Sequence, residues 1–376
     1  MSQGLRLMST FASVSPKDAQ PSQLGQWDFL ALVGPTASGK TKAAMALGQR
    51  YAIELISMDS ALVYRGMDIG TAKPSAHERQ QVRHHLIDVI EPEDAFSAAD
   101  FAKAAQKLIE EIKSRRSIPV LVGGTFLYFN ALVNGLDDMP PADPDTRARI
   151  VLEAAELGWP KMHEQLQSVD PITANRLAPR DSQRIARALE VWRLTGQSIS
   201  AFQSKYANLA SEDQAPESMA YKALTLSFEP KDRAWLHAHI EQRFRQMLTQ
   251  GFLEETFALY KHPALNPSLP SMRCVGYRQA WVFWQAIEAH FGVLPNALPS
   301  QEQLSAWRKT TYYEAFVQTS IASTRQLAKR QLTWLRSMAQ RHVLACDADD
   351  FEPQVQNYLD DAIEHHDTYK HFRRST

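Results

Sequence analysis

One eight-residue string constrains the fold of this chain more than any other feature: GPTASGKT at residues 34–41. It follows an apolar run at 29–33, typical of a buried strand, and leads into a helical pattern at 41–50. In such a strand–loop–helix unit, backbone N–H groups and the positive end of the helix converge on phosphate oxygens, and the lysine adds a full charge. We therefore predict a diphosphate-binding loop formed by Gly34, Thr36, Ala37, Ser38, Gly39, Lys40 and Thr41.

Strand-like runs recur at 53–58, 85–90 and 119–122, with helical patterns such as 98–113 between them. This alternation indicates a parallel sheet with crossover connections. The predicted fold is α/β: a P-loop parallel-sheet core with a helical insertion domain and additional C-terminal helices. Ligands of such sheets gather at the carboxyl ends of the strands. Asp59 and the Gly-Gly-Thr turn at 123–125 stand at two of those ends, so we expect them to share one cleft with the phosphate loop.

Breaks in the pattern predict the domain boundaries. A Pro/Asp-rich stretch at 137–144 ends the alternation, and a loop-like stretch at 204–218 precedes a returning strand at 222–228. Helical patterns then run over 233–248, 277–289 and 303–338. The predicted parts are a disordered tail (1–26), the first part of the core (27–137), a helical insertion (138–215), a return to the core with further helices (216–346) and an acidic C-terminal tail (347–376).

Charge is unevenly distributed, although the formal net charge is only −1. The segment 347–367 holds eight acids and no Lys or Arg, so the rest of the chain is basic. Five cations and no acid lie between Glu314 and Asp347: Arg325, Lys329, Arg330, Arg336 and Arg341. A merely solvated helix face would mix both signs, so this pattern favours a surface that faces a polyanion. Leu327, Trp334 and Met338 are expected to turn away from it, toward the core.

Several classes of protein are excluded by composition. No apolar run is long enough to span a bilayer, and residues 1–11 lack the charged start and long apolar centre of a secretory signal. Two cysteines, Cys274 and Cys346, support neither a disulfide framework nor a four-ligand zinc site. We therefore expect a cytoplasmic protein with no membrane partner.

Asp59 is the candidate for proton transfer. It follows the strand at 53–58, whereas the strand at 119–122 runs into Gly-Gly-Thr without an acid. ATP-hydrolysing P-loop enzymes hold their metal with an acid at the end of a second strand. The pattern thus favours a loop that binds a diphosphate leaving group, with Asp59 available to accept or donate a proton. It does not exclude a kinase. The alternative role for Asp59 is structural, as an aspartate that caps the next turn. The alternative for Thr125 is that the Gly-Gly-Thr sequence forms an ordinary turn with no substrate contact.

Six ordered blocks between about residues 29 and 334 resemble the bacterial tRNA dimethylallyltransferases, also called tRNA isopentenyltransferases. They are GPTASGKT at 34–41, DSALVYRGMDIGTAKP at 59–74, LVGGTFLYFNAL at 121–132, QRIARALEV at 183–191, RCVGYRQ at 273–279 and TRQLAKRQLTWLR at 324–336. The resemblance implies transfer of a dimethylallyl group from dimethylallyl diphosphate to N6 of the adenosine 3′ of the anticodon, with release of diphosphate. The implied tRNAs read codons that begin with U.

The resemblance also implies roles for individual residues. Asp59 would be the general base, Arg243 would contact the diphosphate, Thr125 would complete the catalytic set, and Mg²⁺ would lie near Thr41. Thr125 and Arg147 match positions that hold tRNA. The remaining implied tRNA contacts are Asp59, Ser60, Ala61, Leu62, Gln183, Arg184, Ile185, Ala186, Arg187, Arg273, Cys274, Val275, Gly276, Tyr277, Arg278, Thr324, Arg325, Gln326, Leu327, Ala328, Lys329, Arg330 and Gln331.

The implied partners are the anticodon stem-loop of tRNA, gripped by the helical insertion, and dimethylallyl diphosphate with Mg²⁺; we expect a monomer. Three other functions compete with this interpretation. They are an isopentenyltransferase acting on free adenine nucleotide, a P-loop small-molecule kinase, and a nucleotide-switched binding module. The basic C-terminal helix and the RCVGYR block count against the first of these.

Overall fold

The computed structural model describes residues 26–135, 139–202, 221–292, 294–295, 297–338 and 340–373, which form two compact units. The larger unit comes from Met1–Leu132 and Tyr221–Thr376, and the smaller from Val133–Ala220. The predicted tail at 1–26, apart from Gln26, and the predicted loop at 204–218 lie outside the described residues. No helix in the described ranges is long and apolar enough to cross a membrane.

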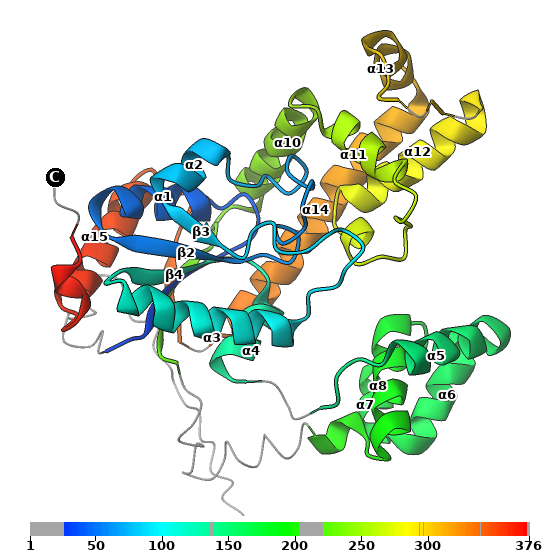
Figure 1. Cartoon of the computed structure of the whole chain (residues 1–376), viewed down its shortest axis with the longest axis horizontal. Helices are drawn as coiled ribbons and strands as arrows, with labels where there is room; N and C mark the ends of the chain where they lie inside the picture. Colours follow the sequence, from blue (N-terminus) through cyan, green and yellow to red (C-terminus); the bar gives the residue numbers. More distant parts are fainter. Residues whose placement is uncertain are drawn as a thin grey trace, which may run out of the picture. The chain divides into compact units, whose positions relative to one another are not determined.

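A six-stranded parallel sheet forms the centre of the larger unit (Figure 1), which confirms the predicted α/β fold. Its strands are β1 (Phe29–Val33), β2 (Ile53–Met58), β3 (Arg83–His85), β4 (Ile118–Gly123), β5 (Ala223–Phe228) and β6 (His342–Leu344), in the order β3-β2-β4-β1-β5-β6. Every residue of β1 and β2 is buried. Continuous apolar strands of this kind are covered on both faces by crossover helices.

Helices cover the sheet as the alternation predicts. α1 (Lys40–Arg50) and α15 (Phe351–Glu364) pack on the face that presents Leu30 and Leu32 of β1. α3 (Ala98–Ser114) lies on the other side, as Figure 1 shows. Short helices fill the connections: α2 (Ala76–Gln81) precedes β3, and α4 (Phe126–Val133) follows β4. The order strand, phosphate loop, helix is therefore present where the sequence predicts it.

The structure differs from the sequence-based prediction at four places. The predicted strand at 85–90 is wrong, because β3 ends at His85 and the left-handed φ values of Leu86 and Asp88 turn the chain away. The helix predicted at 303–338 is two helices, α13 (Gln301–Arg308) and α14 (Thr311–Ser337), because Thr310 caps the second one. The short strand β6 was not predicted. The acidic C-terminal segment contains α15, which is buried against α1.

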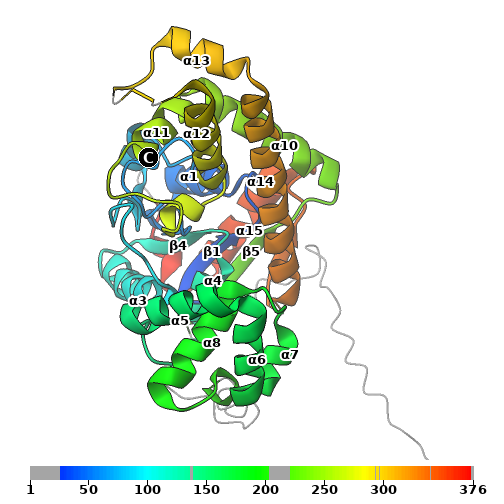
Figure 2. The same ribbon diagram turned by 90° about the vertical axis from the view of Figure 1, so that its right-hand side faces the viewer.

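A second, aromatic-rich core holds the C-terminal helices of the larger unit together. It joins α10 (Arg233–Thr249), α11 (Phe252–Tyr260), α12 (Tyr277–Phe291) and α14 through buried side chains such as Phe244, Phe252, Trp284 and Phe316. Figure 2 shows α14 running beside α10 and α12, with which it is in contact. α14 is thereby fixed to the helices that precede it.

The smaller unit is helical in its described residues, as predicted for the insertion. It contains α5 (Pro144–Leu157), α6 (Trp159–Val169), α7 (Pro171–Arg176) and α8 (Ser182–Thr195) around Ile150, Met162, Leu166, Ile185 and Leu189. Aspartates begin three of these helices: the side chains of Asp143, Asp170 and Asp181 accept hydrogen bonds from backbone N–H groups of the first turn.

Candidate functional site

One cleft of the larger unit gathers the predicted chemical residues; we call it the phosphate-loop cleft. Its lining comes from the loop after β1, the ends of β2 and β4, and the helices α10, α12 and α14. Among the lining residues are Thr36, Lys40, Thr41, Asp59, Gly123, Gly124, Arg243, Cys274 and Gln331. The predicted convergence of the phosphate loop, Asp59 and the end of β4 is confirmed.

The phosphate loop has the backbone that its glycines allow. Gly39, at the start of α1, has φ +86°, and Ala37 has φ +63°. A Cβ added to Gly34 would lie 2.8 Å from the Phe228 carbonyl oxygen, so that position admits only glycine. The Lys40 ammonium folds back over the loop and donates hydrogen bonds to the carbonyl oxygens of Gly34 (2.9 Å) and Pro35 (2.6 Å).

Two cations face this loop without a carboxylate partner in the described part of the chain. Burial is the main cause that lowers the pKa of Lys40 to about 8; the charge of Arg243 adds to it, and Asp59 opposes it. Burial likewise lowers the pKa of Arg243, whose guanidinium lies 3.5 Å from the Thr36 hydroxyl. Two enclosed cations that repel each other form a site that an anion would stabilise.

Asp59 lines the same cleft, directly after β2, and its charge acts on both Lys40 and Arg243. Its Oδ1 accepts a hydrogen bond from the Ala61 N–H at 2.8 Å, so the turn-capping alternative is confirmed for that oxygen. Oδ2 accepts no hydrogen bond within the described residues. Thr125 accepts one from the Ser60 N–H at 3.1 Å and so steadies the same turn. A capped carboxylate with one open oxygen, beside two cations, is able to accept a proton without losing its position.

Sequence reasoning missed Glu255, which binds two residues of the cleft lining, Gly70 and Tyr277. Its carboxylate accepts hydrogen bonds from the N–H groups of Asp68, Ile69 and Gly70 and from the Tyr277 hydroxyl, at 2.6–3.1 Å. It thereby ties the turn at residues 68–70 to α11 and α12. An acid in the first turn of a helix is common, and no sequence signal marks this one.

The predicted tRNA contacts of the larger unit fall into three groups. Arg273, Arg278, Gln326, Lys329 and Arg330 are exposed, as is Ser60. Ala328 is buried, at 1% exposure, and Arg325 pairs with Glu241 at 3.1 Å. Those that line the cleft are Asp59, Ala61, Leu62, Cys274, Val275, Gly276, Tyr277, Thr324, Leu327 and Gln331. The expected inward position of Trp334 is wrong, because its side chain is 58% exposed.

In the smaller unit, Gln183 and Arg184 are exposed, while Ile185 and Ala186 are buried in the helical core. The remaining two predicted contacts converge on a carboxylate that sequence reasoning missed. Arg147 and Arg187 donate hydrogen bonds to the same Oε2 of the fully buried Glu190, at 2.8 and 3.0 Å. Burial acts against this charge, but those hydrogen bonds prevail and lower the pKa of Glu190.

The chemistry of the cleft fits Mg²⁺ as a substrate-borne ion. No cluster of three or more His, Cys, Asp or Glu side chains that could hold a metal occurs among the described residues. Mg²⁺ does not need one, because it keeps several waters and is bound through one or two protein oxygens plus substrate phosphates. The Thr41 hydroxyl and the Asp59 carboxylate both belong to residues that line the cleft.

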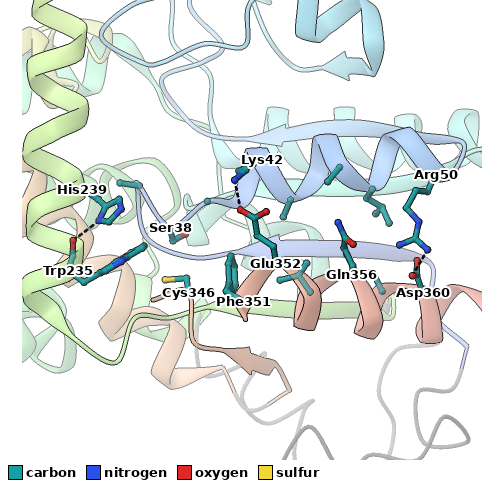
Figure 3. Close-up of a pocket in the computed structure, with 17 residues that line it drawn as sticks. Ser38, Lys42, Arg50, Trp235, His239, Cys346, Phe351, Glu352, Gln356 and Asp360 are labelled. Atoms are coloured by element: carbon teal, nitrogen blue, oxygen red, sulfur yellow. Dashed lines mark hydrogen bonds and ion pairs between the residues drawn. The ribbon is translucent and has the colours of Figure 1, made fainter. Parts of the chain in front are cut away.

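A second cavity, of about 360 Å³, touches the same loop through Ala37, Ser38 and Gly39 (Figure 3). It runs between α1 and α15, and its lining is mainly apolar. At its rim Lys42 pairs with Glu352, and Arg50 pairs with Asp360 at 2.6 Å. Because these cations are already neutralised, and because neither Lys40 nor Arg243 lines it, this cavity is the poorer place for a diphosphate.

Comparison with known proteins gives one consistent result. The profile of the family described as IPP transferase matches residues 62–338. The chain is 51% identical over 336 residues to a protein of a Polaromonas species named tRNA dimethylallyltransferase, covering 89% of this chain and 96% of that one. It is 53% identical over 327 residues to the protein of that name from Paracidovorax citrulli, covering 85% and 87%.

Solved structures agree with these sequence matches. The crystal structure of a full-length tRNA isopentenylpyrophosphate transferase from Bacillus halodurans has a TM-score of 0.58 and 32% identity, over 88% of this chain and 95% of that one. A eukaryotic dimethylallyltransferase, described as acting on tRNA, shares the fold with a TM-score of 0.66 at 21% identity, over 88% and 77%.

Proposed function

The chain belongs to the IPP transferase family, and from this premise we propose that it is a tRNA dimethylallyltransferase that uses dimethylallyl diphosphate as donor. One observation carries the proposal. A phosphate loop with two cations that have no carboxylate partner among the described residues, Lys40 and Arg243, shares a cleft with the carboxylate of Asp59. This arrangement suits a reaction in which a diphosphate leaves and a proton is removed.

The proposed acceptor is N6 of the adenosine 3′ of the anticodon, in tRNAs reading codons that begin with U. The N6 lone pair is delocalised into the ring, so it becomes nucleophilic only as its proton is taken. Asp59 accepts that proton while N6 forms a bond to the allylic carbon. The bond from that carbon to the diphosphate oxygen breaks with its electron pair, and Lys40, Arg243 and the loop N–H groups receive the departing charge.

Mg²⁺ is proposed as the cofactor, held by the Thr41 hydroxyl together with diphosphate oxygens. When bound, it would neutralise charge on the leaving group. Lys40 and Arg243 then orient the diphosphate and keep it in the cleft, while the hydrogen bonds of the Ser60 N–H to Thr125 and of the Ala61 N–H to Asp59 Oδ1 keep Asp59 in place.

The anticodon stem-loop is the proposed partner, and the exposed cations Arg273, Arg278, Lys329 and Arg330 support it because they suit phosphate contacts. The adenosine leaves its stack to enter the cleft, at less cost in a loop than in a duplex. We propose a monomer that acts in the cytoplasm.

The decisive experiment incubates the protein with labelled dimethylallyl diphosphate, Mg²⁺ and either unmodified tRNA or adenine nucleotide. Label in tRNA supports the proposal. Label only in free nucleotide supports the nucleotide isopentenyltransferase, and label in neither contradicts prenyl transfer altogether. An assay with labelled ATP and metabolites then tests the kinase.

A further inference from the structure

Trp334 is an exposed aromatic residue that neither the core nor the proposed chemistry uses. It lies in the last turns of α14, where Leu332 and Leu335 already anchor the helix in the core. Its indole makes no ring contact or hydrogen bond within the described residues. The Trp334 side chain is large, apolar and 58% exposed, and the helix is anchored without it. It is therefore available to contact a partner.

The face of α14 that lines the phosphate-loop cleft leads directly to this residue. Thr324, Leu327 and Gln331 line the cleft at i, i+3 and i+7. At about 100° per residue, position 334 is rotated by only about 20° from Leu327 and stands about 4.5 Å along the axis beyond Gln331. Trp334 therefore continues the cleft face one step past the cleft.

The charge around Trp334 limits what can cover it. Arg330 lies one turn earlier on the same face, is exposed, and forms no ion pair in the described ranges. Lys329 and Arg336 are also exposed and unpaired there. A second copy of this chain would bring like charges together across a symmetric contact. A polyanion that carries flat aromatic groups fits both features.

We propose that Trp334 stacks on a base of the tRNA loop next to the nucleotide that enters the cleft, with Arg330 on an adjoining phosphate. This inference rests on the proposed function and extends it by one substrate-contacting residue. Stacking on an aromatic side chain tolerates any base, because every base has a flat face. Trp334 would thus hold the loop open beside the cleft without selecting its sequence.

Binding of an unmodified anticodon stem-loop tests the proposal with three variants. Trp334→Leu keeps the apolar bulk and removes the aromatic face, so we expect affinity to fall about tenfold. Trp334→Phe keeps an aromatic face and should retain most of the affinity. Phe291→Leu, at a residue of α12 that is 51% exposed, is the matched control and should bind like wild type. In turnover, Trp334→Leu should raise KM for tRNA and leave KM for dimethylallyl diphosphate unchanged.

Stem-loops with a single abasic site in the loop identify the base. At one loop position, removal of the base should weaken binding to the wild-type protein about tenfold. The same abasic site should have little effect on binding to Trp334→Leu. The proposal is overturned if Trp334→Leu binds like wild type, if no position shows this coupling, or if the variant changes only the oligomeric state. If wild type puts no label into tRNA, the proposed function itself has failed, which is a separate result from an unchanged Trp334→Leu.

Discussion

Gln331 binds the phosphate loop through the backbone of Thr36: its Oε1 accepts a hydrogen bond from the Thr36 N–H at 2.9 Å. Its Nε2 donates to the Gly124 carbonyl oxygen at 3.0 Å. One side chain from a C-terminal helix thus joins the two loops that follow β1 and β4. A Cβ added to Gly124 would lie 2.3 Å from Nε2, so the contact also requires glycine there.

Gln331→Ala should therefore impair diphosphate binding more than it lowers the stability of the fold. Two hydrogen bonds of about 1 kcal/mol each are lost, so we expect kcat/KM for dimethylallyl diphosphate to fall by up to about thirtyfold. Gln326→Ala, an exposed glutamine of the same helix, is the control. Equal kcat/KM for both variants would show that the phosphate loop does not depend on this bridge.

Asp59→Asn separates the two roles of that side chain. The amide oxygen can still accept the Ala61 N–H bond, so the turn should persist, but the amide cannot take up a proton. We expect kcat to fall by about 10² or more while tRNA affinity stays unchanged. Single-turnover rates and binding assays measure the two quantities. Wild-type kcat in this variant would remove Asp59 from the mechanism.

The parts of the structure that follow from local sequence were predictable. β1 and β2 have the predicted bounds because buried central strands are continuous apolar runs. The phosphate loop and Asp59 stand at strand ends, and the topology brings strand ends together. The strand at 85–90 was wrong because nothing in its apolar run reveals the left-handed turn at Leu86.

What could not be predicted depends on contacts between distant residues. Gln331 meets Thr36 and Gly124 across the fold, and Glu255 holds backbone groups far earlier in the chain. Trp334 was expected inside because it is apolar, but Leu332 and Leu335 fill the core at that level. A helical pattern identifies faces; it does not determine which neighbouring element covers each of them.

Binding of dimethylallyl diphosphate should weaken at alkaline pH. The pKa of Lys40 is about 8 in the free protein, so the ammonium is present below that pH and lost above it. A diphosphate binds the charged form, so KM for dimethylallyl diphosphate should rise above about pH 8, by up to about tenfold per pH unit. Steady-state KM between pH 6.5 and 9.5 measures this effect.

Lys40→Ala is the control for that pH profile. It should have a higher KM at every pH, and the rise above about pH 8 should be absent, because the titrating group is gone. Arg243 stays charged throughout the range and contributes no inflection. A rise above pH 8 that persists in Lys40→Ala would assign the titration to another group.

Removal of Arg187 should lower the stability of the fold more than removal of Arg184, although the family resemblance implies a tRNA contact for both. Arg187 satisfies the buried Glu190, whereas Arg184 pairs with Asp181 at the surface. Arg187→Ala leaves that carboxylate with Arg147 as its one cationic partner among the described residues, so we expect the free energy of unfolding to fall by about 1–3 kcal/mol. Arg184→Ala should change it by less than about 0.5 kcal/mol.

The pH dependence of this difference has a defined sign. The pKa of Glu190 lies below its ordinary value of 4.5 in the folded state, because hydrogen bonds from Arg147 and Arg187 outweigh burial. Its stabilising contribution is therefore present above about pH 4.5 and is lost as the pH falls through the folded pKa. Denaturant unfolding at pH 7 should separate wild type from Arg187→Ala, and at lower pH the two curves should converge. Equal stability of the Arg187 and Arg184 variants at pH 7 would mean that Arg147 alone satisfies Glu190, leaving Arg187 to tRNA.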